Sequence, residues 1–295
     1  MTEHNRVGEL QQSLAGAGYI ADRALAATLL LFTELQRPLL LEGDAGVGKT
    51  EVARVLSDVF ACPLIRLQCY EGLDVNSSVY EWNYQHQLLA IKLLERGEVS
   101  PDSAEQHIFS QKYLLERPLL RAITQPDSPV LLIDEIDRAD EEFEAYLLEL
   151  LSDFQISVPE LGTITARSRP YVILTSNGTR ELSDALRRRC LYHYLEYPDF
   201  DKELSIIHAR VPEIGPQLAR QVVAFVQELR KQDLRKKPGV AEALDWVAAL
   251  LNLRVTGLAE DPQAVVDSLV CLLKTREDRA AIHEPLLERL IAQAV

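Results

Sequence analysis

Short runs of apolar residues alternate with longer amphipathic segments over the first two thirds of the chain. The runs are PLLLEG (38–43), PLIRLQC (63–69), VLLID (130–134), YVILTSN (171–177) and CLYHYLEY (190–197). A continuous apolar run is typical of a strand that is buried on both faces of a parallel sheet. With helical segments between the strands, the pattern predicts an α/β fold in which helices cover a parallel sheet of five strands.

The pattern changes near residue 200. Beyond YPDF (197–200) the strand signal stops and amphipathic helical stretches follow one another, such as QLARQVVAFVQELRK (217–231) and VAEALDWVAALLNL (240–253). We therefore expect two domains, an α/β core over residues 1–200 and a small all-helical domain over residues 201–295.

Two segments interrupt the alternation of strands and helices in the core. The first, near residues 71–97, is polar and aromatic and continues into a helical stretch. Its Trp82, Tyr84 and His86 either face a partner or pack the insertion onto the sheet. The second, near residues 154–167, alternates apolar and polar residues on both sides of PELG, which predicts a hairpin with Gly162 in its turn.

Composition excludes some classes of function. The formal net charge of -14 weighs against a protein that mainly grips nucleic-acid phosphates. The four cysteines show no CxxC spacing and the six histidines no HExxH motif, so we expect neither disulfides nor a zinc site.

The longest apolar stretch, residues 24–32, is too short to cross a bilayer, and the first residues do not resemble a signal peptide. We therefore expect a cytoplasmic protein without a transmembrane segment.

The strongest motif, GDAGVGKT, lies directly between the first strand and a helix. It consists of Gly43, Asp44, Ala45, Gly46, Val47, Gly48, Lys49 and Thr50, and Glu51 follows it. In this context the pattern G-x-x-x-x-G-K-[ST] is typical of a phosphate-binding loop. Backbone N–H groups and the helix N-terminus cradle the phosphates, Lys49 reaches the β and γ phosphates, and the Thr50 hydroxyl ligates magnesium. We therefore predict ATP and Mg²⁺ as cofactors.

Polar residues also end the third and fourth strands. Asp134 is placed to hold the magnesium, and Glu135 to activate an attacking water. A helix N-terminal cap is the alternative interpretation, which accounts for Asp140 and Glu141 but not for an acidic pair that ends an apolar strand. Asn177 ends the fourth strand, where open α/β sheets bind ligands, and we expect it to position the water beside Glu135.

With these motifs in this order, the chain resembles the AAA+ ATPases and, within them, the MoxR family. The resemblance extends from about Gly18 to the end and includes the nucleotide loop, LLIDEID, the strand that ends at Asn177, LSDALRRRC and both insertions. More narrowly, LIRLQCYEGLD, YEWNYQHQLL and KPGVAEALDW resemble the CoxD subgroup, which is linked to maturation of aerobic carbon-monoxide dehydrogenase. The resemblance implies a ring, usually a hexamer, with each ATP at a subunit boundary.

The resemblance also implies roles for further residues. An arginine finger from the neighbouring subunit should lie shortly after Asn177, and Arg189 is the first match and Arg188 the second. Arg187 fits a solvated helix end. The family places adenine against the segment that here contains Tyr19 and Ile20, although an amphipathic core helix accounts for these two residues about as well.

One departure from the family pattern lies in the helical domain. MoxR relatives usually carry a sensor-2 arginine early in a lid helix, whereas RKKPGVAEAL has Gly239 at the corresponding place. A lid cation could come from Arg235, Lys236 or Lys237, and the sequence leaves this choice open.

The resemblance implies an ATP-hydrolysing chaperone that remodels or matures a client protein. It further implies a von Willebrand A-domain partner and, for the subgroup, a molybdenum-containing carbon-monoxide dehydrogenase as client. A nucleic-acid-directed AAA+ motor is one alternative, which the acidic charge and the lack of a basic stripe disfavour. A small-molecule kinase is disfavoured by the helical domain and the arginine run. An ATP-gated scaffold with little hydrolysis is suggested by the unusual sensor-2 segment.

Overall fold

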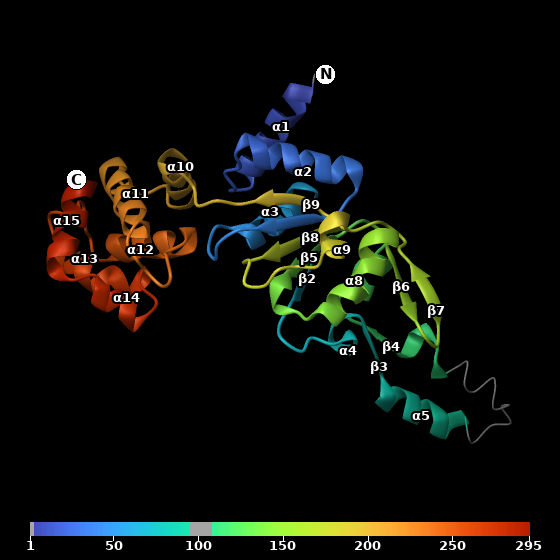
Figure 1. Ribbon diagram of the computed structural model, residues 1–295. Coiled ribbons are helices and arrows are strands. Elements are labelled where there is room, and N and C mark those ends of the chain that lie inside the picture. Colours follow the sequence, from blue (N-terminus) through green and yellow to red (C-terminus); the bar gives the residue numbers. More distant parts are fainter. Residues whose placement is uncertain (1–2, 95–107) are drawn as a thin grey trace. The chain divides into compact units, whose positions relative to one another are not determined.

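The computed structural model of the protein describes residues 3–94 and 108–295 (Figure 1). Residues 95–97 of the first predicted insertion lie outside these ranges. By their contacts, the described residues form two compact units. Among the described residues, the first unit contains 3–7, 23–42 and 53–194, and the second contains 8–22, 43–52 and 195–295.

A five-stranded parallel sheet forms the centre of the first unit. Its strands are β1 (Leu39–Glu42), β2 (Leu64–Gln68), β5 (Val130–Asp134), β8 (Tyr171–Ser176) and β9 (Leu191–Tyr194), in the spatial order β2-β5-β8-β1-β9. Every pairing is parallel. The register sets Gln68 beside Asp134 and Glu42 beside Ser176, so the carboxyl ends of the strands share one edge. The predicted fold class is therefore confirmed.

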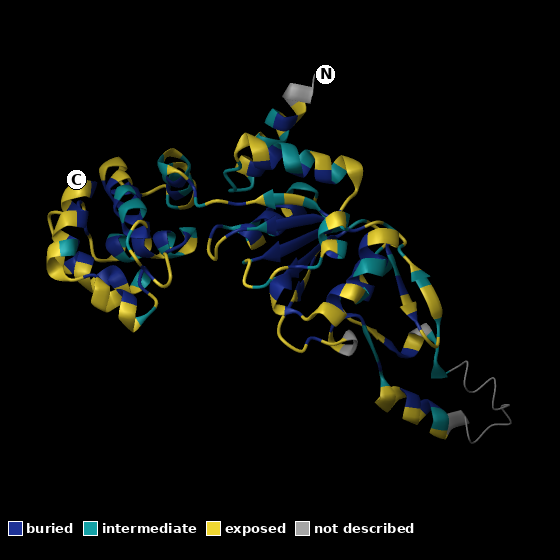
Figure 2. Cartoon of the chain, viewed as in Figure 1, coloured by how far each residue is buried: buried dark blue, intermediate teal, exposed yellow. Residues whose placement is uncertain are grey.

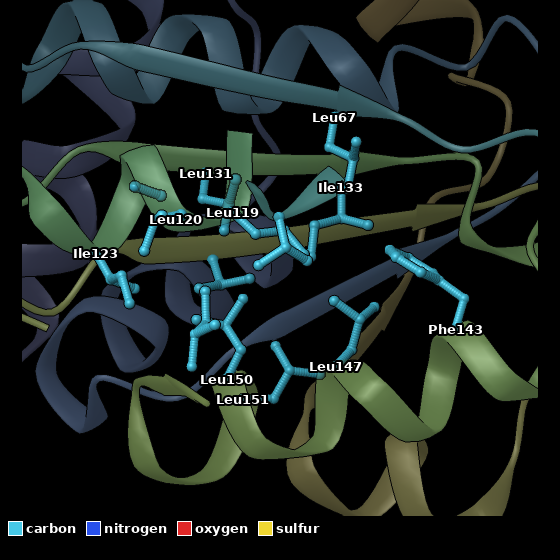
Figure 3. Close-up of a cluster of buried hydrophobic side chains, with 14 of the residues drawn as sticks. Leu67, Leu119, Leu120, Ile123, Leu131, Ile133, Phe143, Leu147, Leu150 and Leu151 are labelled. Carbon is cyan, nitrogen blue, oxygen red and sulfur yellow. The ribbon is translucent and has the colours of Figure 1, made fainter. Parts of the chain in front are cut away.

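Helices cover the sheet on both faces, which is why its central strands are continuously apolar. Leu131 and Ile133 of β5 belong to one hydrophobic cluster with side chains of α7 (Pro118–Thr124) and α8 (Glu141–Asp153) (Figure 3). Because side chains alternate along a strand, Val130 and Leu132 point to the opposite face. All five residues of β5 are buried, and β8 and β1 are buried over most of their length (Figure 2). The other helices that precede residue 190 in the described ranges, apart from those of the first insertion, are α1 (Glu3–Gly16), α2 (Arg23–Leu35), α3 (Lys49–Val59), the short 3-10 helix η2 (Ile136–Arg138) and α9 (Asp184–Arg189).

The first insertion contains a small sheet that the sequence analysis did not predict. Its elements are α4 (Val75–Ser78), β3 (Tyr80–Trp82), α5 (Tyr84–Leu94), η1 (Gln111–Tyr113) and β4 (Leu114–Glu116), and β3 pairs antiparallel with β4. Trp82 is buried and meets the ring of Phe109 edge-on at 5.2 Å, so it packs the insertion together. Tyr84 and His86, in contrast, are exposed. The strands escaped prediction because three residues are too few to show a period.

The second insertion is an antiparallel hairpin of β6 (Gln155–Val158) and β7 (Gly162–Thr165). Gly162 has φ 80°, a left-handed conformation that glycine adopts without steric cost, and it follows the turn directly.

The helical part of the second unit has a core of its own. Its elements are α10 (Phe200–Arg210), α11 (Pro216–Arg230), α12 (Val240–Asn252), α13 (Pro262–Ser268), η3 (Leu269–Cys271), α14 (Arg276–Ala281) and α15 (Glu284–Ala294). The rings of Phe225 and Trp246 meet in this core at 4.8 Å. Proline begins α11 and α13, where its missing N–H removes no helical hydrogen bond. None of the described helices combines the length and the apolar character that crossing a membrane requires.

A buried ion pair joins two helices of this unit. Both nitrogens at the end of the Arg230 guanidinium donate to the Glu203 carboxylate, at 2.7 and 2.6 Å, and the two side chains are almost completely buried. The Arg230 Nε donates to the carbonyl of Pro238 at 2.8 Å. Arg230 thereby links α10 to the segment that leads into α12.

We expect Arg230→Met to lower the free energy of unfolding of the helical unit by about 3–5 kcal/mol, because it leaves the Glu203 charge buried without a counter-charge and with only the Gln227 amide donating to it. Urea unfolding followed by Trp246 fluorescence, in a Trp82→Phe background, measures this change. The matched control is Lys231→Met, which removes an exposed pair with Glu228 and should cost at most about 1 kcal/mol. If both variants lowered the free energy of unfolding equally, the buried pair of Arg230 with Glu203 would not be the stabilising interaction that we infer.

Candidate nucleotide-binding site

The nucleotide loop runs from Gly43 to Gly48, and α3 begins at Lys49. Gly46 and Gly48 have φ 82° and 95°, so the loop curls through left-handed conformations that residues with a side chain rarely adopt. The buried Lys49 ammonium donates to the carbonyl oxygens of Gly43 at 2.6 Å and Asp44 at 2.7 Å. Carbonyl oxygens of the loop therefore fix the position of the Lys49 ammonium.

Tyr19 and Glu51 flank the loop within the same compact unit. A Cβ atom added to Gly48 would lie 3.9 Å from Cε2 of Tyr19, so the ring lies against the loop. Burial, with the charges of Asp22 and Glu51, raises the pKa of Tyr19, so its hydroxyl stays neutral. Glu51 accepts a hydrogen bond from Arg210 of α10 at 2.5 Å. Contacts of adenine with Tyr19 and the half-buried Ile20 stay predictions.

Asp134 ends β5 with both carboxylate oxygens engaged. Oδ1 accepts a hydrogen bond from the Thr175 hydroxyl of β8 and Oδ2 accepts one from the Arg66 guanidinium of β2, each at 2.5 Å. Neither Thr175 nor Arg66 was predicted, because their roles arise from pairing between strands far apart in sequence. Oxygen donors such as this carboxylate and the Thr50 hydroxyl are the ligands that Mg²⁺ prefers. Because the Asp134 carboxylate already pairs with the cationic Arg66 guanidinium, its charge also suits a metal ion. That Thr50 and Asp134 hold Mg²⁺ together stays a prediction.

Glu135 turns the chain sharply after β5. It adopts a left-handed conformation with φ 55° and ψ 50°, and its N–H donates to the Thr175 hydroxyl at 2.9 Å. Its side chain accepts from Arg138 Nε at 2.8 Å and does not cap a helix. Asp140, in contrast, caps α8 by accepting from the Phe143 N–H at 2.8 Å. The cap interpretation thus holds for Asp140 but not for Glu135.

The loop after β8, which carries Asn177, is held by a third carboxylate. Asp137 Oδ2 accepts the N–H of Asn177 at 3.2 Å, the N–H of Thr179 at 3.0 Å and the Thr179 hydroxyl at 2.6 Å. Burial alone would raise the pKa of Asp137, but these hydrogen bonds together bring it below its ordinary value. This role was not predicted from the sequence, although Asp137 lies in the same LLIDEID motif.

The two candidate finger arginines differ in their surroundings. Arg189 Nε donates to Ser152 Oγ at 2.5 Å and its Nη1 to the Ala185 carbonyl at 2.9 Å, which fixes the guanidinium. The Arg188 side chain is exposed and forms no hydrogen bond or ion pair within residues 3–94 and 108–295. Arg187 approaches Glu42 at 3.4 Å.

The cations proposed for the helical domain lie beside the nucleotide loop. Arg235, Lys236 and Lys237 line a cavity of about 560 Å³ whose wall also includes Asp44, Ala45, Gly46 and Lys274. All three side chains are exposed, and the structure does not select one of them.

The parallel sheet and the glycine-rich loop together define a P-loop nucleotide-binding protein. The chain belongs to the family described as AAA domain (dynein-related subfamily), whose profile matches residues 38–190 and so includes the nucleotide loop, Asp134, Glu135 and Asn177. The fold is thus an AAA+ fold. Similar chains include an uncharacterized protein of Staphylococcus epidermidis (strain ATCC 12228), 25% identical over 257 residues that cover 84% of this chain and 89% of that protein.

An uncharacterized protein of Staphylococcus aureus (strain USA300) is 25% identical over 263 residues, which cover 85% of this chain and 89% of that protein. Among solved structures, the Thermotoga maritima RuvB Holliday junction branch migration motor matches with a TM-score of 0.44 and 17% identity. That match covers 91% of this chain and 69% of that one.

Because the folded state lowers the pKa of Asp137, its ionised form contributes stability that is present above the ordinary pKa of 3.8 and is lost as pH falls through the folded-state value. We expect Asp137→Asn to lower the free energy of unfolding by about 1–3 kcal/mol at pH 7. The difference in free energy of unfolding between the unmodified protein and Asp137→Asn should become smaller below pH 3.8. Urea unfolding at several pH values measures this difference. Asp127→Asn, in an exposed loop, is the control, and a gap that stays constant with pH would exclude the carboxylate as the cause.

Proposed function

We propose that this protein is an ATPase that binds ATP at Gly43–Thr50 and hydrolyses it with Glu135 as the base that activates water. The main support for the proposal is that the acidic residues at and after the end of β5 form different contacts, and that Glu135 has no structural role like those of the others. Asp140 caps α8 and Asp137 holds the loop of Asn177. Glu135 performs neither task, because it has a left-handed backbone and its side chain does not cap the short helix that follows. Such a backbone costs on the order of 1–3 kcal/mol and is more often found at functional sites.

Two arginines partly neutralise the carboxylates at the end of β5. Arg66 contacts Asp134, and Arg138 contacts Glu135. Both arginine side chains are more than half exposed, but Asp134 is buried whereas Glu135 is partly exposed. The Arg138–Glu135 pair is therefore the weaker of the two and is worth only about 0–1 kcal/mol. In our proposal Thr50 and Asp134 would hold Mg²⁺, which would neutralise charge on the phosphates. Arg66 would then give up its contact with Asp134, and Glu135 would become free to act as a base once its exposed contact with Arg138 is broken.

We further propose that the protein acts as a ring in which Arg189 serves the ATP site of the neighbouring subunit. Two observations support Arg189 over Arg188. Its guanidinium is fixed through Nε and Nη1, whereas Nη2 has no hydrogen bond among the described residues. A planar guanidinium that is already oriented loses little entropy on binding a phosphate. The chaperone activity, the MoxR type, the von Willebrand A-domain partner and the molybdenum-enzyme client rest on the resemblance of the motifs.

We expect Glu135→Gln to reduce ATP hydrolysis by about 10²- to 10⁴-fold while ATP binding persists, because the amide cannot accept the proton of water. Phosphate release and binding of a fluorescent ATP analogue measure the two effects. Lys49→Ala should lose binding as well. The matched control is Glu141→Gln, an exposed acidic residue in the first turn of α8. Normal hydrolysis by Glu135→Gln would contradict the proposed base, and strong stimulation by duplex DNA would favour the nucleic-acid motor instead.

We expect Arg189→Ala to lower hydrolysis by about 10³-fold without a change in nucleotide affinity, because a finger acts on the transition state. Arg188→Ala is the neighbouring control and should stay active. Specific activity of the unmodified protein should rise with concentration. Mixing Arg189→Ala with Glu135→Gln should restore part of the activity, since some interfaces then combine an intact base with an intact finger. An absence of rescue, or a fully active Arg189→Ala, would refute the finger in trans.

A further inference from the structure

The first turn of α12 lies directly against the nucleotide loop. The N–H of Val240, the first residue of this helix, donates to the carbonyl oxygen of Gly46 at 2.9 Å. Gly46 lies in the middle of the loop, and both residues belong to the second compact unit. A main-chain hydrogen bond therefore joins the phosphate-binding loop to a helix almost 200 residues further along the chain.

Two glycines face each other beside this hydrogen bond. A Cβ atom built on Gly239 would lie 2.6 Å from the Cα and 2.7 Å from the carbonyl oxygen of Gly46. A Cβ atom built on Gly46 would lie 2.9 Å from the Cα of Gly239. Real Cβ atoms do not approach backbone atoms this closely. Any side chain at either position would therefore push the helix and the loop apart.

The conformation of Gly239 shows that the contact, and not the backbone, requires glycine there. Gly239 has φ -83° and ψ -173°, which every residue type adopts freely. Gly46, in contrast, has φ 82° and needs glycine for its conformation as well. Gly239 is also the residue at which the sequence departs from the pattern of the family it resembles.

Buried groups of the helical unit hold the start of α12 in position. Arg230, paired with Glu203, donates to the carbonyl of Pro238, the residue before Gly239. The Glu242 carboxylate accepts the N–H of Gly239 at 3.0 Å. These contacts hold the first turn of α12 against Gly46, so the conformation of the loop and that of the helix start depend on each other.

We propose that Gly239 and Val240 are positioning residues of the ATP site and that α12 responds to nucleotide through their contact with Gly46. This inference rests on the proposed binding of nucleotide at Gly43–Thr50. When phosphates settle into the loop, the carbonyl of Gly46 is held in the position that the Val240 N–H requires. Nucleotide binding and ordering of the first turn of α12 thereby stabilise each other.

Val240→Pro tests the hydrogen bond with little effect on the helix itself. Proline is well tolerated at a first helical position, and α11 and α13 already begin with it. Because one hydrogen bond contributes about 1 kcal/mol, we expect the affinity for Mg²⁺–ADP to fall about fivefold in isothermal titration calorimetry. Gly239→Ala adds a steric clash and should weaken binding at least about tenfold. The matched control is Gly215→Ala, which also precedes the first residue of a helix in this unit but would meet no atom within 4 Å.

Hydrogen exchange of α12 gives the readout that a purely structural role would not change. In the unmodified protein Mg²⁺–ADP should slow exchange in the first turn of α12 and in α3, whereas in Val240→Pro only α3 should respond. Variants that keep the affinity of the unmodified protein and the response of α12 would overturn the inference. A protein that binds ADP with the α12 response but never hydrolyses ATP would refute only the proposed ATPase. If the unmodified protein binds no nucleotide, both proposals fail.

Discussion

Burial of a parallel sheet on both faces is the constraint on which the rest of this structure depends. Parallel neighbours cannot be joined by tight turns, so helices must return the chain to the starting edge after each strand. All carboxyl ends therefore meet at one edge, where the apolar runs stop and polar residues begin. β8 lies between β5 and β1, so Asn177 follows a strand that is flanked by the strands ending at Asp134 and Glu42. The polar residues of this unit are gathered by topology and not by closeness in sequence.

At this edge, similar side chains are given different tasks by their hydrogen bonds. Asp134 contacts Thr175 and Arg66, and Asp137 holds the loop that carries Asn177. Buried carboxylates are costly unless they are hydrogen-bonded or paired, and both of these are. Glu135 is less buried, and among residues 3–94 and 108–295 its carboxylate pairs with the exposed Arg138 alone. Its charge is therefore the one most easily released for chemistry, which agrees with its proposed role as a base.

In the second unit, the nucleotide loop is shaped by close backbone approaches. Gly43 faces the carbonyl of Leu195, only 2.2 Å from where a Cβ atom would lie, and Gly46 faces Gly239. These glycines exclude side chains so that main-chain groups can come together. Arg230, which is paired with Glu203, holds the residue before Gly239 in place by donating to the carbonyl of Pro238. The glycine contact joins the loop to α12 without a charged side chain.

The sequence by itself determined the strands of the central sheet, the loop motif and the AAA+ class, because these depend on local patterns. VLLID matches β5 residue for residue, and GDAGVGKT stands between a strand and a helix as predicted. It did not determine the short β3–β4 pair, the contacts of Arg66 and Thr175 with Asp134, or the meeting of Gly46 with Gly239. Each of these joins residues that are far apart along the chain, and no local period or spacing encodes their distance. Only the tertiary structure decided them, because strand pairing and packing choose which distant residues become neighbours.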